Sequence, residues 1–273
     1  MSDAGRVRAL HRYPVKSAGG EALRTARVGT DGLVGDRIWA LVDDDGVVVS
    51  AKHPRPWGRL LDVTARVQAL SDEVTVAVPD VAVTPAGSPE ANGALSRWLG
   101  RHVTLTRSPP PDPVLHRWWP EEPGLIPEWV TGAVPGTATR TPLPPHPEGR
   151  FFDGGTVHLV TTAALATLAR RHGRPVDHGR FRPNIVAELP ADPAPGQRMR
   201  IGTDVVIEVT LPTPRCAVPA LDHGGGADDG LLRTLARYHR TEIAPFGRAT
   251  CFGVYAAVVT PGRVRVDDDI AVL

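Results

Sequence analysis

The chain has 273 residues, of which 41% are hydrophobic and 22% charged, with a formal net charge of +1. This is the composition of a globular protein, and the length allows one large domain or two of ordinary size. The near-neutral charge gives no support for a nucleic-acid or anionic-membrane partner. Residues 1–17 lack the apolar segment of a secretory signal, and the apolar run at 156–169 is too short to span a bilayer.

The two cysteines, Cys216 and Cys251, form neither a disulfide framework nor a CxxC zinc motif. We therefore predict a reduced protein of the cytoplasm. Of the 31 Lys and Arg residues only two are lysines, Lys16 and Lys52. Against this bias, the position of a lysine is more informative than usual.

Short strands are predicted over most of the first hundred residues. Apolar and polar residues alternate with a period close to two, and Asp, Gly and Pro mark the turns between the runs. The turn sequence DDDG predicts a hairpin between the second and third of these strands. The segments with the strand pattern are residues 6–15, 37–42, 47–50, 73–78 and 81–85.

Three helices are predicted along the chain. The first two, residues 88–100 and 163–173, each follow a Ser or Thr that can act as N-cap and end at a glycine. The third, residues 228–240, places leucines on one side, as an amphipathic helix does.

The segment from Pro109 to Pro147 holds twelve of the 28 prolines and three tryptophans, Trp118, Trp119 and Trp129. Proline at this density cannot build a central strand or helix. An interdomain linker is one interpretation, but linkers are usually polar and tryptophans favour burial. We therefore expect an ordered excursion that helps to wall a site.

Strands return after residue 150. Residues 157–160 form one strand, 198–210 form a hairpin around a Gly-Thr-Asp turn, and 252–273 are predicted as two strands joined through Pro261-Gly262. There is no alternating βαβ pattern in the sequence. The expected fold class is therefore mainly β with a few helices (α+β), with a β-barrel-like architecture.

One cysteine lies in an unusual loop. In LPTPRCAVPALD, residues 211–222, Cys216 follows Arg215 among three prolines. An adjacent cation favours the thiolate, which is the form that binds metals or attacks, and prolines stiffen the loop. No histidine has zinc-ligand spacing with Cys216, so its thiolate would supply one bond to a metal whose other ligands belong to an organic cofactor. A structural cysteine is the simpler alternative, and Cys251, in an apolar run, fits it better.

Four further stretches offer contacts for an anion. A cation, a hydroxyl and backbone N–H groups come together in the loop YPVKSAGG, and the helix N-terminus after VHLV favours a phosphate. No P-loop or GxGxxG motif is present. The residues singled out in these stretches are Lys16, Ser17, Arg37, Thr161, Thr162, Arg180, Arg182 and Asn184.

Together these motifs resemble the MOSC family. The resemblance is closest to the members that carry an N-terminal β-barrel domain before the MOSC domain, such as the mitochondrial amidoxime-reducing component and its bacterial relatives. The matching stretches occur in the family's order, from YPVKSAGGEAL through GRFRPNIV and PRCAVPALD to the C-terminus. The resemblance implies three parts. These are a smaller N-terminal MOSC β-barrel domain (1–108), a Pro/Trp-rich connecting excursion (109–149) and a MOSC β-barrel domain (150–273).

The resemblance also implies a molybdenum cofactor (Mo-molybdopterin) with its metal bonded to Cys216. Asp222, near the cysteine in sequence, is the expected proton donor. The chain departs from the family pattern at Pro214 and at His223, on what would be the substrate side. The implied cofactor contacts are Lys16, Ser17, Arg37, Thr161, Thr162, Arg182, Asn184, Arg215 and Tyr255.

The activity that the resemblance implies is reduction of a small-molecule N-hydroxylated or other N–O substrate. Electrons would come from a separate ferredoxin- or flavoprotein-type donor, because the sequence has neither a dinucleotide-binding motif nor the cysteines of an iron–sulfur relay. No nucleic-acid or membrane partner is expected. Two alternatives stay open: a module that binds or carries the cofactor without turnover, and sulfur transfer through a persulfide on Cys216.

Overall fold

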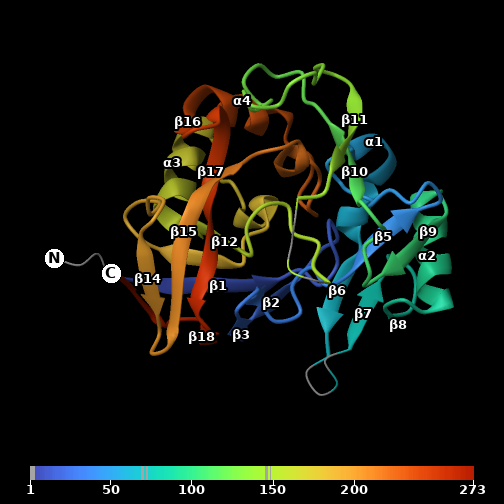
Figure 1. Ribbon diagram of the computed structural model, residues 1–273, viewed down its shortest axis with the longest axis horizontal. Helices are drawn as coiled ribbons and strands as arrows, with labels where there is room; N and C mark the ends of the chain where they lie inside the picture. Colours follow the sequence, from blue (N-terminus) through green and yellow to red (C-terminus); the bar gives the residue numbers. More distant parts are fainter. Residues whose placement is uncertain (1–3, 69–70, 72, 145–146, 148) are drawn as a thin grey trace.

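The computed structural model describes residues 4–68, 71, 73–144, 147 and 149–273, and its main feature is a closed β-barrel (Figure 1). Seven strands of the described chain pair in a ring, because β17 bonds both to β15 and back to β12. The ring runs in the order β12 (Val157–Thr161), β13 (Ile185–Glu188), β1 (Ala4–Arg12), β19 (Asp269–Val272), β14 (Arg198–Ile201), β15 (Val205–Pro214) and β17 (Gly247–Thr260). β2 (Glu21–Leu23) adds to β1, and β16 (Arg240–Ile243) adds to β17.

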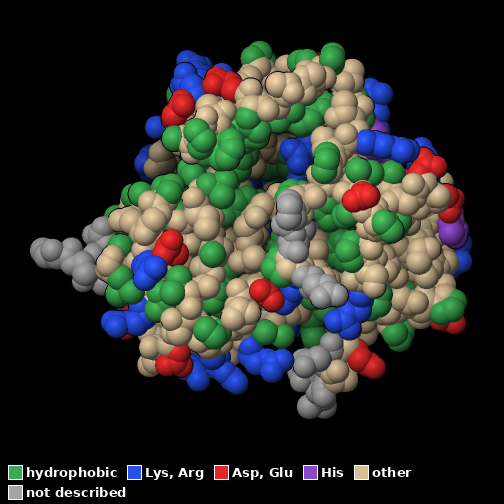
Figure 2. All heavy atoms as spheres, viewed as in Figure 1, with side chains coloured by type: hydrophobic (Ala, Val, Ile, Leu, Met, Phe, Trp, Pro, Cys, Tyr) green, Lys and Arg blue, Asp and Glu red, His purple; other side chains and the backbone are tan. Residues whose placement is uncertain are grey.

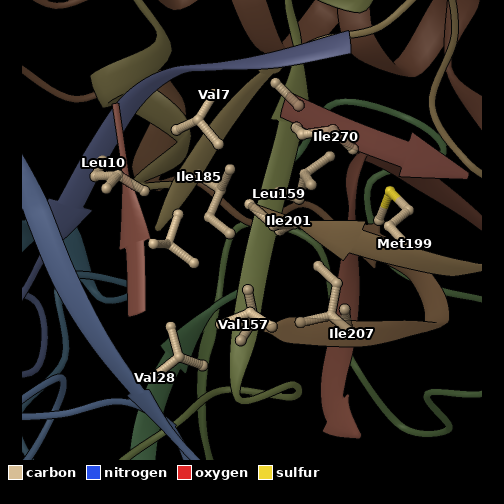
Figure 3. Close-up of a cluster of buried hydrophobic side chains, with 14 of the residues drawn as sticks. Val7, Leu10, Val28, Val157, Leu159, Ile185, Met199, Ile201, Ile207 and Ile270 are labelled. Carbon is tan, nitrogen blue, oxygen red and sulfur yellow. The ribbon is translucent and has the colours of Figure 1, made fainter. Parts of the chain in front are cut away.

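The barrel interior is filled by apolar side chains, most of them branched aliphatic (Figure 3). They come from alternate positions of the strands, as the period of two requires. Val7, Leu159, Met199, Ile207 and Ile270 are each completely buried there. The predicted α+β fold class with a β-barrel is confirmed.

Two helices pack on the outside of the barrel, α3 (Thr162–His172) and α4 (Asp229–Tyr238). The hydroxyl of Thr161 accepts a hydrogen bond from the N–H of Ala164 at 3.2 Å, and Gly173 ends α3 in the left-handed conformation. The predicted leucine side of α4 is buried at Leu231 and Leu235. Local sequence signals therefore set both helices.

The N-terminal half builds a second hydrophobic core. The hydroxyl of Ser88 accepts from the N–H of Ala91 at 3.1 Å, and Gly100 ends the helix, as predicted for this segment. The elements here are β5 (Ala40–Asp43), α1 (Pro54–Trp57), a 3-10 turn η1 (Gly58–Asp62), β6 (Thr64–Val67), β7 (Val74–Ala77), β8 (Thr84–Pro85), α2 (Pro89–Leu99) and β9 (Val103–Thr106).

The end of the chain differs from the prediction. Residues 252–273 were expected to hold two strands, but β17, β18 (Gly262–Arg265) and β19 share this segment. β18 leaves the barrel and pairs with β3 (Thr25–Gly29), which also pairs with β4 (Gly32–Leu33). The left-handed Asp267 then turns the chain back into the barrel as β19. The pairing of β18 with a strand so distant in sequence is decided by tertiary structure, and the period of apolar residues does not reveal such a partner.

The Pro- and Trp-rich excursion packs against the rest of the molecule. Its strands β10 (Val114–Trp118) and β11 (Ala138–Pro142) form an antiparallel pair beside α1 (Figure 1). Trp119 is buried and its indole N–H donates to the hydroxyl of Thr139 at 2.7 Å. The division into 1–108, 109–149 and 150–273 stays a prediction, and residues 1–3, 69, 70, 72, 145, 146 and 148 of these ranges lie outside the described residues.

No helix in the described part of the chain is long and apolar enough to cross a membrane.

Candidate functional site

A cavity of about 280 Å³ lies between the barrel and the excursion. Figure 2 shows a hollow on this face, with Lys and Arg side chains visible within it. Its lining comes from the loops after β1 and before β5, from the excursion, and from the turn after β15 that carries Cys216. The residues singled out in the sequence that line it are Lys16, Ser17, Arg37, Arg180, Arg182, Asn184, Arg215, Cys216 and Tyr255.

The cavity is strongly cationic. Among its described lining residues Asp153 supplies a single carboxylate. Such an excess of positive charge in a concave, partly desolvated space favours an anionic ligand. The cations that line it are Lys16, Arg37, Lys52, Arg117, Arg180, Arg182 and Arg215.

Both lysines of the chain contact the same carboxylate. Oδ1 of Asp153 lies 2.5 Å from Nζ of Lys16 and 2.8 Å from Nζ of Lys52. Burial lowers the pKa of Lys16 to about 8, partly offset by Asp153. Burial alone would raise the pKa of Asp153, but the two lysines outweigh it and hold that pKa well below its ordinary value. Sequence reasoning missed Lys52 and Asp153 as site residues, although the rarity of lysine was a signal for the first.

Three of the lining residues have a strained backbone. Ser17, Arg37 and Arg182 have φ values of 62°, 49° and 54°, in the left-handed region that side chains other than glycine rarely adopt. A residue held in this region costs on the order of 1–3 kcal/mol, and such residues gather at functional sites. The strained residues and the cations therefore lie on the same cavity.

Asp36 is fully buried behind the cavity and holds two of its lining residues. Its carboxylate pairs with the guanidinium of Arg37 and accepts from Nδ2 of Asn184 at 3.1 Å and from the N–H of Tyr13 at 2.7 Å. Oδ1 of Asn184 in turn accepts from the N–H of His158 at 3.0 Å. The amide of Asn184 is thus engaged within the protein, where it ties β12 and β13 to the loop of Arg37.

Arg182 lines the cavity and keeps one buried donor unpaired among the described residues. Its Nη1 donates to the carbonyl of Ala18, its guanidinium lies 4.3 Å from the ring centroid of Tyr13, and its Nη2 is buried with no hydrogen-bond partner in the described chain. Burial and then Arg37 lower the pKa of Arg182 to about 10, so it stays charged at neutral pH. A buried, charged and unpaired donor fits an anionic group of a ligand.

The Cys216 thiol is partly exposed, in the turn between β15 and the 3-10 helix η3 (Val218–Ala220). Nε of Arg215 donates to the carbonyl of Thr213 at 3.1 Å, which fixes the strand end before the cysteine. No group of three His, Cys, Asp or Glu side chains that could hold a metal is found among the described residues. Of the two cysteines, Cys216 is the one that lines the cavity.

Arg180 holds the chain that follows Cys216. It lies in the 3-10 helix η2 (His178–Phe181), and its guanidinium donates to the carbonyls of Pro219 at 3.1 Å, Leu221 at 2.9 Å and Gly226 at 2.7 Å. Three hydrogen bonds from one charged group stabilise this loop against local opening.

Replacing Arg180 by glutamine is therefore expected to expose Cys216 more often. Loss of charged hydrogen bonds worth about 1.5–3 kcal/mol corresponds to roughly tenfold or more in the open population. The measurement is the rate at which a disulfide reagent labels Cys216, in a Cys251→Ala background and in protein made without molybdate. Arg170→Gln, which removes an exposed guanidinium bonded to Thr167 on α3, is the control. Equal labelling rates in both variants would contradict this role for Arg180.

Tyr255 and His158 lie next to each other, with ring centroids 5.5 Å apart. Burial raises the pKa of Tyr255 to about 12, and burial with Arg215 and Arg37 nearby holds the pKa of His158 well below its ordinary value. Both are therefore neutral at physiological pH. A Cβ at Gly155 would lie 2.5 Å from Cβ of Tyr255, so glycine is required there. His158 gave no signal in the sequence, because its burial depends on barrel closure.

Three predicted residues do not line the cavity. Thr161 is fully buried and donates to Asp192 at 2.6 Å, and Thr162 begins α3. Asp222 is exposed, and its carboxylate accepts from the N–H groups of Gly224 and Gly226, both at 2.8 Å. These backbone bonds lower the pKa of Asp222. Asp222 is close to Cys216 in sequence, but the turn at η3 carries it to the surface.

Cys251 lies in a different environment from Cys216. It is buried in a small cluster with Ile243 and Ala249, and burial raises the pKa of its thiol to about 11. This is the setting of a structural cysteine.

The fold and the cavity define a class: β-barrel proteins with a cationic site beside a cysteine. The family model of the MOSC domain matches residues 148–271, and that of the MOSC N-terminal beta barrel domain matches residues 4–95. The chain belongs to the MOSC family, among the members that carry both domains.

Relatives with known names are similar over the whole chain. Mitochondrial amidoxime-reducing component 1 of Mus musculus is 24% identical over 302 residues, covering 100% of this chain and 84% of the mouse protein. Mitochondrial amidoxime reducing component 2 of Rattus norvegicus is 25% identical over 291 residues, covering 99% of this chain and 84% of the rat protein. Among solved structures, the YuaD protein of Bacillus subtilis aligns with a TM-score of 0.46 at 11% identity, covering 100% of this chain and 97% of that one.

Proposed function

We propose that this protein is a molybdenum-cofactor oxidoreductase that reduces N-hydroxylated or other N–O compounds with electrons from a separate carrier. The MOSC family and the similarity to amidoxime-reducing components support the reaction class. The observation that carries the proposal is the cavity, in which Cys216 lies on the same surface as buried cations and the unpaired N–H of Arg182.

The residues present fit the cofactor. A molybdopterin carries a phosphate, and the unpaired Nη2 of Arg182, with Lys16 and Arg37 on the same wall, would bind it. The thiolate of Cys216 would ligate the metal. When bound, the cofactor would supply the two-electron chemistry that removes oxygen from the substrate, while the protein supplies orientation and electrostatics.

The surrounding groups would hold the reacting region in place. Arg215 fixes the approach to Cys216, and the neutral phenol of Tyr255 can donate a hydrogen bond within the cavity. The excursion covers one side of the cavity and would limit the entry of water. Asp222, the proton donor predicted from the resemblance, lies outside this wall, so the geometry does not support that role.

Analysis of metal and pterin tests the proposal. Protein purified from molybdate-replete cells is expected to hold about one molybdenum and one pterin per chain, because Cys216 is a single soft ligand. A reduced viologen dye should then drive reduction of benzamidoxime, whereas NADPH alone should not. Bound cofactor without turnover would favour a carrier module. A persulfide on Cys216 in metal-free protein would favour sulfur transfer.

A further inference from the structure

The cavity has two unlike walls. The barrel side supplies most of the cations described above, whereas the excursion side is aromatic and apolar apart from one arginine among its described residues. None of these residues is a cofactor contact in the resemblance to the family. The excursion residues that line the cavity are Arg117, Trp118, Trp119, Pro120, Leu125, Pro127, Trp129 and Pro144.

The aromatic rings of this wall are held by neighbouring side chains. Trp119 is 3% exposed, and its indole N–H is already used by Thr139. Trp118 stacks on His53 with an interplanar angle of 7° and a centroid distance of 6.2 Å. Flat, fixed and apolar surfaces of this kind bind planar rings, because little side-chain entropy is lost when the ring packs against them.

Arg117 adds a charge to this wall. Its guanidinium carbon lies 5.3 Å from the ring centroid of Trp119, and its Nε is buried without a hydrogen-bond partner in the described chain. No salt bridge joins it to a carboxylate among the described residues, in contrast to Arg140 on the neighbouring strand β11, which pairs with Asp45 at 2.7 Å. An arginine over an aromatic ring, with no carboxylate partner among the described residues, is suited to an anionic group on a ring-shaped ligand.

The wall continues to the outside. Trp129 lines the cavity, is 36% exposed, and lies with its ring centroid 6.0 Å from that of Phe246, which is 60% exposed. Two exposed aromatic side chains in contact at a cavity are unusual on a surface and indicate a binding site. They offer a flat ligand a first contact before it reaches Trp118 and Arg117.

We propose that this wall is the substrate subsite, and that the substrate is a planar aromatic compound that carries a carboxylate. The ring lies against the tryptophans and the carboxylate pairs with Arg117. The N–O group of the substrate rests on the function proposed above, whereas the preference for a ring with an anion rests on the wall alone.

Binding of two ring compounds to the full-length protein tests the subsite without turnover. The probes are 4-carboxybenzamidoxime and benzamidoxime, titrated by calorimetry in the absence of reductant. The carboxylate is expected to improve the Kd about tenfold, as a charge-assisted hydrogen bond does. Arg117→Gln should remove this preference and leave the Kd of benzamidoxime unchanged. Arg140→Gln, on the same hairpin, should keep it.

Trp129→Leu should weaken the binding of both probes by a similar factor and leave the ratio of their Kd values unchanged, because it removes ring contact and no charge. Equal Kd values for the two probes in the unmodified protein, or a preference that survives Arg117→Gln, would overturn the subsite. Preferential binding without turnover by the viologen assay would support the subsite and refute the proposed function. Turnover with no preference in Kd or in kcat/KM would support the proposed function and refute the subsite.

Discussion

Cys216→Ala is expected to abolish turnover and to remove most of the bound molybdenum. The physical reason is that, in the function proposed above, Cys216 supplies the thiolate that ligates the metal, and phosphate contacts from Arg182 and Lys16 would not replace a metal–sulfur bond. The measurements are metal content by mass spectrometry and reduction of benzamidoxime with a reduced viologen. Retention of pterin with loss of metal would show that the phosphate contacts act independently of the cysteine.

The matched control is Cys251→Ala. Cys251 is 4% exposed in a small apolar cluster, so this change should cost on the order of 1 kcal/mol in stability and leave metal and activity in place. The opposite pattern, with metal lost from Cys251→Ala and kept in Cys216→Ala, would show that Cys216 is not the metal ligand.

Asp36→Asn is expected to be among the most destabilising single substitutions in the protein. The carboxylate is 0% exposed and compensates the charge of Arg37, whose side chain is 13% exposed. Removing one partner of a buried ion pair costs about 3–5 kcal/mol, since the other charge stays buried without compensation. The new amide N–H₂ would also face the donors of Asn184 and Arg37. The measurement is the urea midpoint of unfolding, followed by circular dichroism.

Asp45→Asn serves as the control for charge removal as such. Asp45 pairs with Arg140 at 2.7 Å, but their side chains are 68% and 52% exposed, so the change should alter stability by no more than about 1 kcal/mol. The variant at Asp36 should also hold less pterin, because Arg37 and Asn184 lose the group that positions them. A urea midpoint equal to that of Asp45→Asn would mean that Asp36 is not the organising carboxylate of the site.

Much of this protein could be predicted from its sequence, because the signals are local. A period of two identified β1, β5 and β7, but residues 47–50 form only an isolated bridge at Val48, and β2, β3 and β4 were not predicted. Ser88 and Thr161 identified helix starts, and the Arg215–Cys216 pair among prolines pointed to the loop that lines the cavity. Each of these features depends on a residue and its near neighbours. The family resemblance then connected distant loops, and Lys16, Arg37 and Arg182 do lie on one cavity.

Other features were decided by tertiary structure. Lys52 and Asp153 are about a hundred residues apart in sequence, yet their side chains meet at 2.8 Å beside Lys16. Arg117 and the tryptophans line the same cavity as Cys216 because the excursion packs against the barrel, whereas Asp222 does not line it although it is near Cys216 in sequence. Periodicity and caps report the preference of a segment for its own conformation. Which side chains share a desolvated cavity depends on how the strands close and where the connecting segments pack, and that is set by long-range burial and pairing.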